Sequence, residues 1–278
     1  MKASFNRYFN IQKSFNNRLI AGYVYQLRAA LKFDSTQCLV GFKQANRDYK
    51  LFGRQDHSAV YPFPSNTWAI ATGRFIAASS SDYLTISFNC NGQQTAFFDN
   101  IVLEKVSSQA YTLESPAVGP DVVPDGGFDI LPLSTYQVDA NAGVTVAIDG
   151  QQNRSAPYAV DISMPEMRYG STLAGGVSQI VTLDTAKVYR VTAYTRFLVN
   201  GECFSNLIFG STDTGLSIYY SDYIPDNTVN TWLPLSLVVL PQYTSMRVWL
   251  QGICFPAIGA GVQIFFDDIE VVPLSSSL

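Results

Sequence analysis

The second half of this 278-residue chain repeats landmarks of the first half at a nearly constant distance. Three landmarks recur 164 positions later: Val24-Tyr25 as Val188-Tyr189, Asn66-Thr67-Trp68 as Asn230-Thr231-Trp232, and Cys90 as Cys254. A fourth, Phe98-Asp99, recurs 168 positions later as Phe266-Asp267, so the loops between landmarks differ by only a few residues. This shared register indicates a tandem duplication, in which both copies have the same architecture.

Apolar and polar residues alternate along the strongest patterns in both copies. Leu84, Ile86 and Phe88 alternate with more polar neighbours, and so do Val248 and Leu250. Alternation with period two is typical of strands that bury one face. Turn-forming clusters such as Pro225-Asp-Asn separate these stretches. We therefore predict an all-β protein made of two antiparallel sandwiches.

The domain boundary is expected in a segment rich in small residues and proline. We assign residues 1–106 to repeat one, 107–121 to a linker, 122–273 to repeat two and 274–278 to a tail. Repeat one lacks about 50 residues found at the start of repeat two. Truncation upstream of Met1, a strand from the linker, or a strand from a second subunit would each account for this difference. We favour the last two, and expect a homodimer, because strand addition readily fills an open sheet edge.

The charge of the chain excludes some partners. The formal net charge is −4, and no run of basic residues is present to follow a phosphate backbone, so we expect no nucleic-acid partner. The most apolar stretch, residues 233–240, is far shorter than the roughly 20 residues that cross a bilayer. We therefore expect no membrane association.

The four cysteines divide equally between the copies. The separation is 52 residues from Cys38 to Cys90 and 51 residues from Cys203 to Cys254, which favours one disulfide in each copy over two buried thiols. A glycosylation sequon at Asn153-Arg-Ser agrees with an oxidising compartment. We expect a secretory-pathway or secreted protein whose signal peptide is absent from this chain.

The order of several landmarks in repeat two resembles a known family. These landmarks are Gly126-Gly-Phe-Asp129, Ser155 to Tyr158, Val177-Ser-Gln-Ile-Val181, Tyr189, Cys203, Thr231-Trp232, Cys254 and Phe266-Asp-Asp-Ile269. Together they resemble the fungal carbohydrate-binding-module-like proteins of the CenC type. The resemblance implies an antiparallel jelly-roll β-sandwich in each copy, hence two in tandem. It also implies a possible structural calcium site, with Asp129 and Asp267 as weak candidates.

Common catalytic arrangements are missing from the sequence. It contains no Gly-x-Ser-x-Gly motif, phosphate-binding glycine loop, dinucleotide fingerprint or zinc-type spacing of cysteine and histidine, so we expect no cofactor. The single histidine, His57, lies between Asp56 and Ser58, where the three side chains cannot align as a relay. Asp267 and Asp268 are neighbours on a strand and point to opposite faces, so they cannot form a glycosidase pair.

Alternation locates a possible binding surface in repeat two. If Val248, Leu250 and Cys254 face the core, then Arg247, Trp249 and Gln251 face outward. The same argument turns Tyr194 and Arg196 outward on the earlier strand. We expect these five residues to form one face, with Tyr219 and Tyr223 of the loop Tyr219-Tyr-Ser-Asp-Tyr223 as a wall. The alternative is that these side chains pack under loops or against the other copy.

Three functions fit this surface. The leading hypothesis comes from the resemblance: a cofactor-free pericyclase, of the hetero-Diels–Alderase type, that joins a tropolone quinone methide to a humulene-type alkene. Arg196, Arg247 and Gln251 would donate to the developing oxyanion, and Trp249, Tyr194, Tyr219 and Tyr223 would bind the small-molecule substrate. The alternative function is non-catalytic carbohydrate binding, and the third is a structural or adhesive module.

Overall fold

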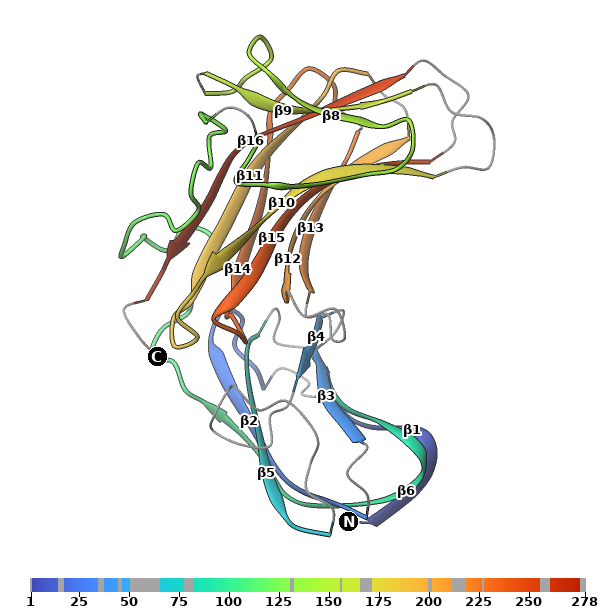
Figure 1. Ribbon diagram of the computed structural model, residues 1–278. Helices are drawn as coiled ribbons and strands as arrows, with labels where there is room; N and C mark the ends of the chain where they lie inside the picture. The colour runs from blue at the N-terminus through green and yellow to red at the C-terminus, as the bar shows by residue number, and fades with distance from the viewer. Residues whose placement is uncertain are drawn as a thin grey trace. The chain divides into compact units, whose positions relative to one another are not determined.

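Alternating apolar residues fold into strands in both halves of the chain, as the computed structural model shows (Figure 1). The structure describes residues 2–14, 18–34, 38–44, 47–50, 66–77, 83–130, 133–155, 157–165, 172–199, 202–211, 219–226, 228–255 and 261–275. No helix among these residues is long and apolar enough to span a membrane. His57, with its neighbours Asp56 and Ser58, lies outside the described residues.

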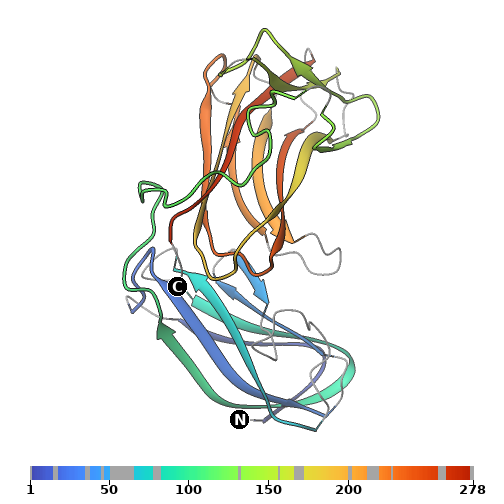
Figure 2. The same ribbon diagram turned by 60° about the vertical axis from the view of Figure 1, so that its left-hand side comes forward.

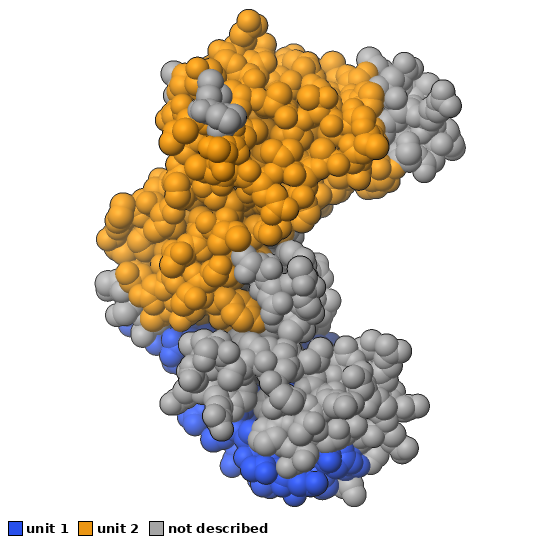
Figure 3. All heavy atoms as spheres, in the orientation of Figure 1, with its two compact units in different colours: residues 1–112, 278 blue, residues 113–277 orange. Residues whose placement is uncertain are grey.

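The chain divides into two compact units, Met1–Thr112 and Leu113–Ser277, which Figure 3 colours separately. The strands of the first unit are β1 (Lys2–Ser14), β2 (Val24–Phe33), β3 (Cys38–Gln44), β4 (Arg47–Lys50), β5 (Ala69–Ile76) and β6 (Tyr83–Lys105). The strands of the second unit are β7 (Gln137–Ala140), β8 (Thr145–Asp149), β9 (Ala159–Met164), β10 (Leu173–Thr182), β11 (Tyr189–Phe197), β12 (Cys203–Ser211), β13 (Tyr219–Pro225), β14 (Leu233–Val239), β15 (Ser245–Cys254) and β16 (Val262–Pro273).

The second unit is a sandwich of two five-stranded sheets. One sheet has the order β13-β12-β15-β10-β7 and the other the order β14-β11-β16-β9-β8, with antiparallel pairing between neighbours. The two inner faces bury their apolar residues against each other. A Cβ added to Gly252 of β15 would lie 2.7 Å from Ile264 Cδ1 of β16, so the missing side chain allows the sheets to approach closely.

The first unit builds the same arrangement with fewer strands. Its single sheet has the path β4-β3-β6-β2-β5, and β1 pairs along β6 from Lys2↔Phe97 to Ser14↔Tyr83. The long strands β1 and β6 curve together in Figures 1 and 2. The first part of β6 corresponds to β15, and its last part corresponds to β16. The curvature brings Phe33 of β2 within 5.8 Å of Phe88, measured between ring centroids. The prediction of two tandem antiparallel β-sandwiches is confirmed.

The duplication extends to single hydrogen bonds. The Asn66 N–H donates to Phe33 O at 2.6 Å, and the Asn230 N–H donates to Phe197 O at 2.7 Å. Both asparagines have positive φ, 55° and 58°, a conformation that asparagine tolerates better than most residues. This backbone requirement explains why the asparagine of the Asn-Thr-Trp landmark recurs in the sequence.

The residues missing from repeat one correspond to edge strands. β1 supplies the pairing that β9 and β10 provide in the second unit, whereas β7 and β8 have no described counterpart in the first. The linker adds no strand to the first unit among the described residues, although the Tyr111 N–H donates to Gly22 O at 2.8 Å. Residues 118–122 instead bond to Val271 and Pro273 of the second unit.

One of the two predicted disulfides is present, and the strand pairing places the cysteines of the other opposite each other. Cys203 lies opposite Cys254 in the β12–β15 pairing, and the two form a disulfide. Cys38 lies opposite Cys90 in the β3–β6 pairing, while their side chains lie outside the described residues.

We predict that Cys38 and Cys90 form a second disulfide. Thiol titration of the denatured, non-reduced protein is expected to detect no free thiol, and four thiols after reduction. Each bond closes a loop of about 50 residues and contributes on the order of 4 kcal/mol through the unfolded state. Detection of two free thiols before reduction would show that only Cys203–Cys254 forms.

Candidate functional site

The candidate site is the outer face of the β13-β12-β15-β10-β7 sheet, hereafter the outer face. On β15 the buried residues Met246, Val248 and Leu250 alternate with partly exposed ones. The partly exposed set is Arg247, Trp249, Gln251 and Ile253. Because side chains of a strand alternate between its two faces, these four point away from the core. The prediction that Arg247, Trp249 and Gln251 face outward is therefore correct.

Strand pairing places several of the predicted residues on this one face. Gln251 lies opposite Asn206 of β12, and Asn206 lies opposite Tyr223 of β13. Arg247 lies opposite Gly210, and Gly210 opposite Tyr219, whose side chain is outside the described residues. Residues opposite each other in a sheet share a face, so Tyr223 joins Trp249, Arg247 and Gln251.

Tyr194 and Arg196 do not belong to this face. Both lie on β11, which belongs to the other sheet, so their outward side chains leave the opposite side of the sandwich. Arg196 Nη2 lies 3.4 Å from Asn230 Oδ1, and the Tyr194 ring is covered by the Arg154 guanidinium at 3.5 Å. The expectation of a single surface formed by β11 and β15 is wrong, because alternation gives the side of a strand but not the sheet to which the strand belongs.

An aromatic cluster stands at one end of the outer face. Phe204 of β12 lies 6.3 Å from Tyr223, edge to face, and 5.6 Å from Phe255 just after β15, measured between ring centroids. The Tyr223 side chain is 66% exposed and Phe255 is 45% exposed, which is unusual for large aromatic residues. We call Phe204, Tyr223 and Phe255 the aromatic cluster.

The sequence interpretation missed Phe204 and Phe255, although a signal for both was present. Each phenylalanine follows a cysteine directly, and the two cysteines are buried. Because the Cys203–Cys254 disulfide occupies the inner side of the two strands, alternation sends Phe204 and Phe255 outward. The disulfide thus fastens the strand ends that carry two of the three rings.

Trp249 lies across the middle of the outer face. A Cβ added to Gly176 of β10 would lie 2.8 Å from Trp249 Nε1, so the indole occupies the space above a glycine. Trp249 Nε1 and Ser178 Oγ are buried, and neither has a hydrogen-bond partner among the described residues. Trp249 and Ser178 lie opposite each other in the β10–β15 pairing. Because both atoms are buried, neither is exposed to a ligand on the surface of the outer face.

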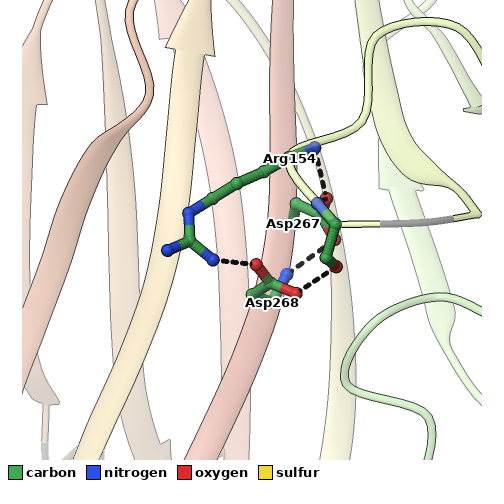
Figure 4. A network of polar contacts seen from close by, with 4 residues as sticks. Arg154, Asp267 and Asp268 are labelled. Atoms are coloured by element: carbon green, nitrogen blue, oxygen red, sulfur yellow. Dashed lines mark hydrogen bonds and ion pairs between the residues drawn. The ribbon is translucent and has the colours of Figure 1, made fainter.

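A network of polar contacts lies at β16, in the other sheet (Figure 4). The Arg154 and Ser155 N–H groups donate to Asp267 Oδ2 at 2.8 and 3.0 Å. Arg154 forms an ion pair with Asp268, whose carboxylate also accepts the Ser155 hydroxyl. Asp267 is fully buried, and burial raises its pKa to about 6 although the two N–H donors act in the opposite direction.

These residues do not fit a calcium ion. Both oxygens of Asp267 already accept N–H groups, since Oδ1 takes the Asp268 N–H at 2.8 Å. Asp129, the other candidate, is exposed. No group of three or more His, Cys, Asp or Glu side chains able to hold a metal is found in the described parts of the chain. Asp267 is a structural acceptor that holds residues 154–155 against β16.

Comparisons with known proteins give similarities of fold. No protein-family model matches the chain, and no curated protein matches it. The solved structure of TmCBM61 in complex with β-1,4-galactotriose is 20% identical with a TM-score of 0.44, covering 56% of this chain and 99% of that chain. The tandem CBM22-1-CBM22-2 domain of Paenibacillus barcinonensis Xyn10C is 11% identical with a TM-score of 0.40, covering 94% of this chain and 82% of that chain.

The raised pKa of Asp267 predicts a pH dependence of stability. Because the folded-state pKa of about 6 lies above the ordinary value near 4, this group stabilises the fold below about pH 4, and the contribution is lost as the pH rises through 6. We expect Asp267→Asn to reduce the loss of unfolding free energy between pH 4.5 and 7, measured by urea denaturation. Asp129→Asn, at an exposed position, is the matched control. Parallel profiles for wild type and Asp267→Asn would contradict the assignment.

Proposed function

We propose that the second unit binds a carbohydrate chain on the outer face. The observation that carries this proposal is the aromatic cluster, exposed on a sheet whose strand ends are fixed by a disulfide. A pyranose ring presents an apolar face of C–H groups, which packs well against a flat aromatic ring. Tyr223 offers such a ring with two thirds of its surface open to solvent.

Polar side chains beside the rings suit the hydroxyl groups of a sugar. Asn206 and Gln251 lie opposite each other, on the first and second strands away from Tyr223. An amide side chain both donates and accepts hydrogen bonds, as a hydroxyl does, so two neighbouring amides match two neighbouring hydroxyls. Arg247 adds a further donor on the same face.

The shape of the outer face also supports an extended ligand. Its polar and aromatic residues lie across three adjacent strands, β13, β12 and β15, rather than around a single point. A sheet at this spacing presents neighbouring strands about 5 Å apart, which is close to the length of one sugar residue. A chain of several sugar residues would therefore contact the rings and the amides at once.

Cycloaddition between a tropolone quinone methide and a humulene-type alkene stays a prediction from the sequence resemblance. Such a reaction needs walls around both reactants and a donor near the developing oxyanion. Arg196 and Tyr194 lie on the opposite side of the sandwich, so two of the three predicted donors, Arg247 and Gln251, lie on the outer face. Incubation with tropolone precursors and humulenol tests this alternative on the same protein.

Binding to a panel of soluble polysaccharides, including xylan, galactan and β-glucan, tests the proposal. Affinity electrophoresis should show retardation by at least one polysaccharide, and calorimetry with the corresponding oligosaccharide should give its Kd. Tyr223→Ala is expected to raise that Kd by about tenfold, since an exposed ring contributes on the order of 1 kcal/mol or more. Gln251→Ala should have a smaller effect in the same direction.

Arg196→Ala is the matched control, because Arg196 lies on the other sheet and should leave the Kd unchanged. Tyr223 is exposed, so its replacement should not alter the melting temperature. Binding that survives in Tyr223→Ala and in Gln251→Ala would move the site away from the outer face. Absence of binding to the whole panel, together with product formation that Arg247→Ala slows, would replace carbohydrate binding by catalysis.

A further inference from the structure

The two units differ in how they cover one edge of their longest strand. In the second unit, β11 pairs with one edge of β16. β9 covers the first half of the other edge, from Val262 to Phe266. Residues 118–126 cover the second half. There the Ile269 N–H donates to Gly126 O at 2.8 Å, and the Val122 N–H donates to Val271 O at 3.0 Å.

The corresponding edge of β6 in the first unit is open. β2 pairs with one edge of β6, and β1 covers the other edge only as far as Phe97. No described residue pairs with that edge over residues 101–105. The exposures agree, because Ile101 is 47% exposed while its counterpart Ile269 is 3% exposed. We call residues 101–105 the open edge.

The correspondence identifies the backbone groups that lack a partner. Leu103 lies opposite Leu27 in the β2–β6 pairing, as Val271 lies opposite Val191 in the β11–β16 pairing. The Val271 N–H and C=O both bond to residues 121–122, with the N–H donating to Asp121 Oδ1 at 2.8 Å. The Leu103 N–H and C=O therefore point to the open edge. An open edge of this kind accepts an extended strand.

We propose that the open edge pairs with the open edge of a second copy of this chain. Antiparallel pairing around a two-fold axis at Val102 would place Ile101 opposite Leu103 of the other copy, twice. It would also bring Asp99, at one end, towards Lys105 at the other end, again twice. The edge is thus complementary to itself in charge and in apolar character, which is the condition for a closed two-fold dimer.

Two side chains of the open edge are apolar and exposed, as expected of a surface that a partner covers. Val102 is 41% exposed, next to Ile101, and Ile70 on β5 is 53% exposed. Val102 and Ile70 line a depression on the outside of the β2–β5–β6 layer, together with Arg28, Ala29, Ala30, Asn100 and Glu104. A strand added to the open edge would lie beside β6 and cover Ile101 and Val102, and removing their apolar surface from water favours association.

Light scattering of the whole chain measures the predicted dimer. We expect a mass of about twice 30.6 kDa at micromolar concentration. Leu103→Pro removes the outward N–H and leaves the pairing of neighbouring residues with β2 possible, so it should raise the dimer Kd by at least about tenfold. Ile101→Lys should do the same. Ile20→Lys, at a similarly exposed position of the same unit, is the matched control and should leave the mass unchanged.

A charge exchange and an engineered cysteine distinguish the loss of dimer pairing from the loss of folding. Lys105→Asp should weaken the dimer, and the double variant Asp99→Lys with Lys105→Asp should restore it, which a misfolded chain cannot do. Val102→Cys should form an intermolecular disulfide on oxidation, because the axis places the two residues directly opposite each other. Val138→Cys, exposed in the second unit, should not. A monomer at 100 µM would overturn the proposal, and so would a dimer that none of these edge variants weakens.

Discussion

Backbone hydrogen bonding along the last strand of each unit determines the rest of this structure. A strand inside a sandwich carries N–H and C=O groups on both edges, and each edge needs a partner when water is excluded. β16 obtains its partners from β11, β9 and residues 118–126, whereas β6 obtains them from β2, β1 and β3. The position of Asp121, the close approach of Gly126 and the network at Asp267 all follow from completing the edge of β16.

The disulfide of the second unit affects both faces of one sheet. Its sulfur atoms lie among the buried side chains, where Cys203 and Cys254 are 3% and 0% exposed. The next residues, Phe204 and Phe255, stand on the outer face. Binding to pre-positioned rings costs less conformational entropy than binding to rings on free strand ends. The same pair of strands therefore supplies both stability and a prepared surface.

Much of the fold was predictable from the sequence because its signals are local or repeated. Period-two alternation gave the strands, and the recurrence of Asn66 as Asn230 reflected a backbone position with positive φ in both copies. The assignment of strands to sheets was not predictable in this way. Arg196 and Arg247 both point outward, yet one lies on β11 and the other on β15, in different sheets. Alternation carries no information on long-range pairing. Phe255 was missed although alternation from the buried Cys254 sends its side chain outward.

The pairing of β1 with β6 has a consequence for the order of folding during synthesis. Lys2 pairs with Phe97, so β1 has no partner until nearly the whole of the first unit has been synthesised. Closure of this sheet joins the two ends of a long loop, which makes the step slow compared with forming local hairpins. During that interval Phe5, Phe9 and Ile11 of β1 are without their native neighbours. The first unit therefore has a stage at which a chaperone that holds extended apolar segments would raise its yield.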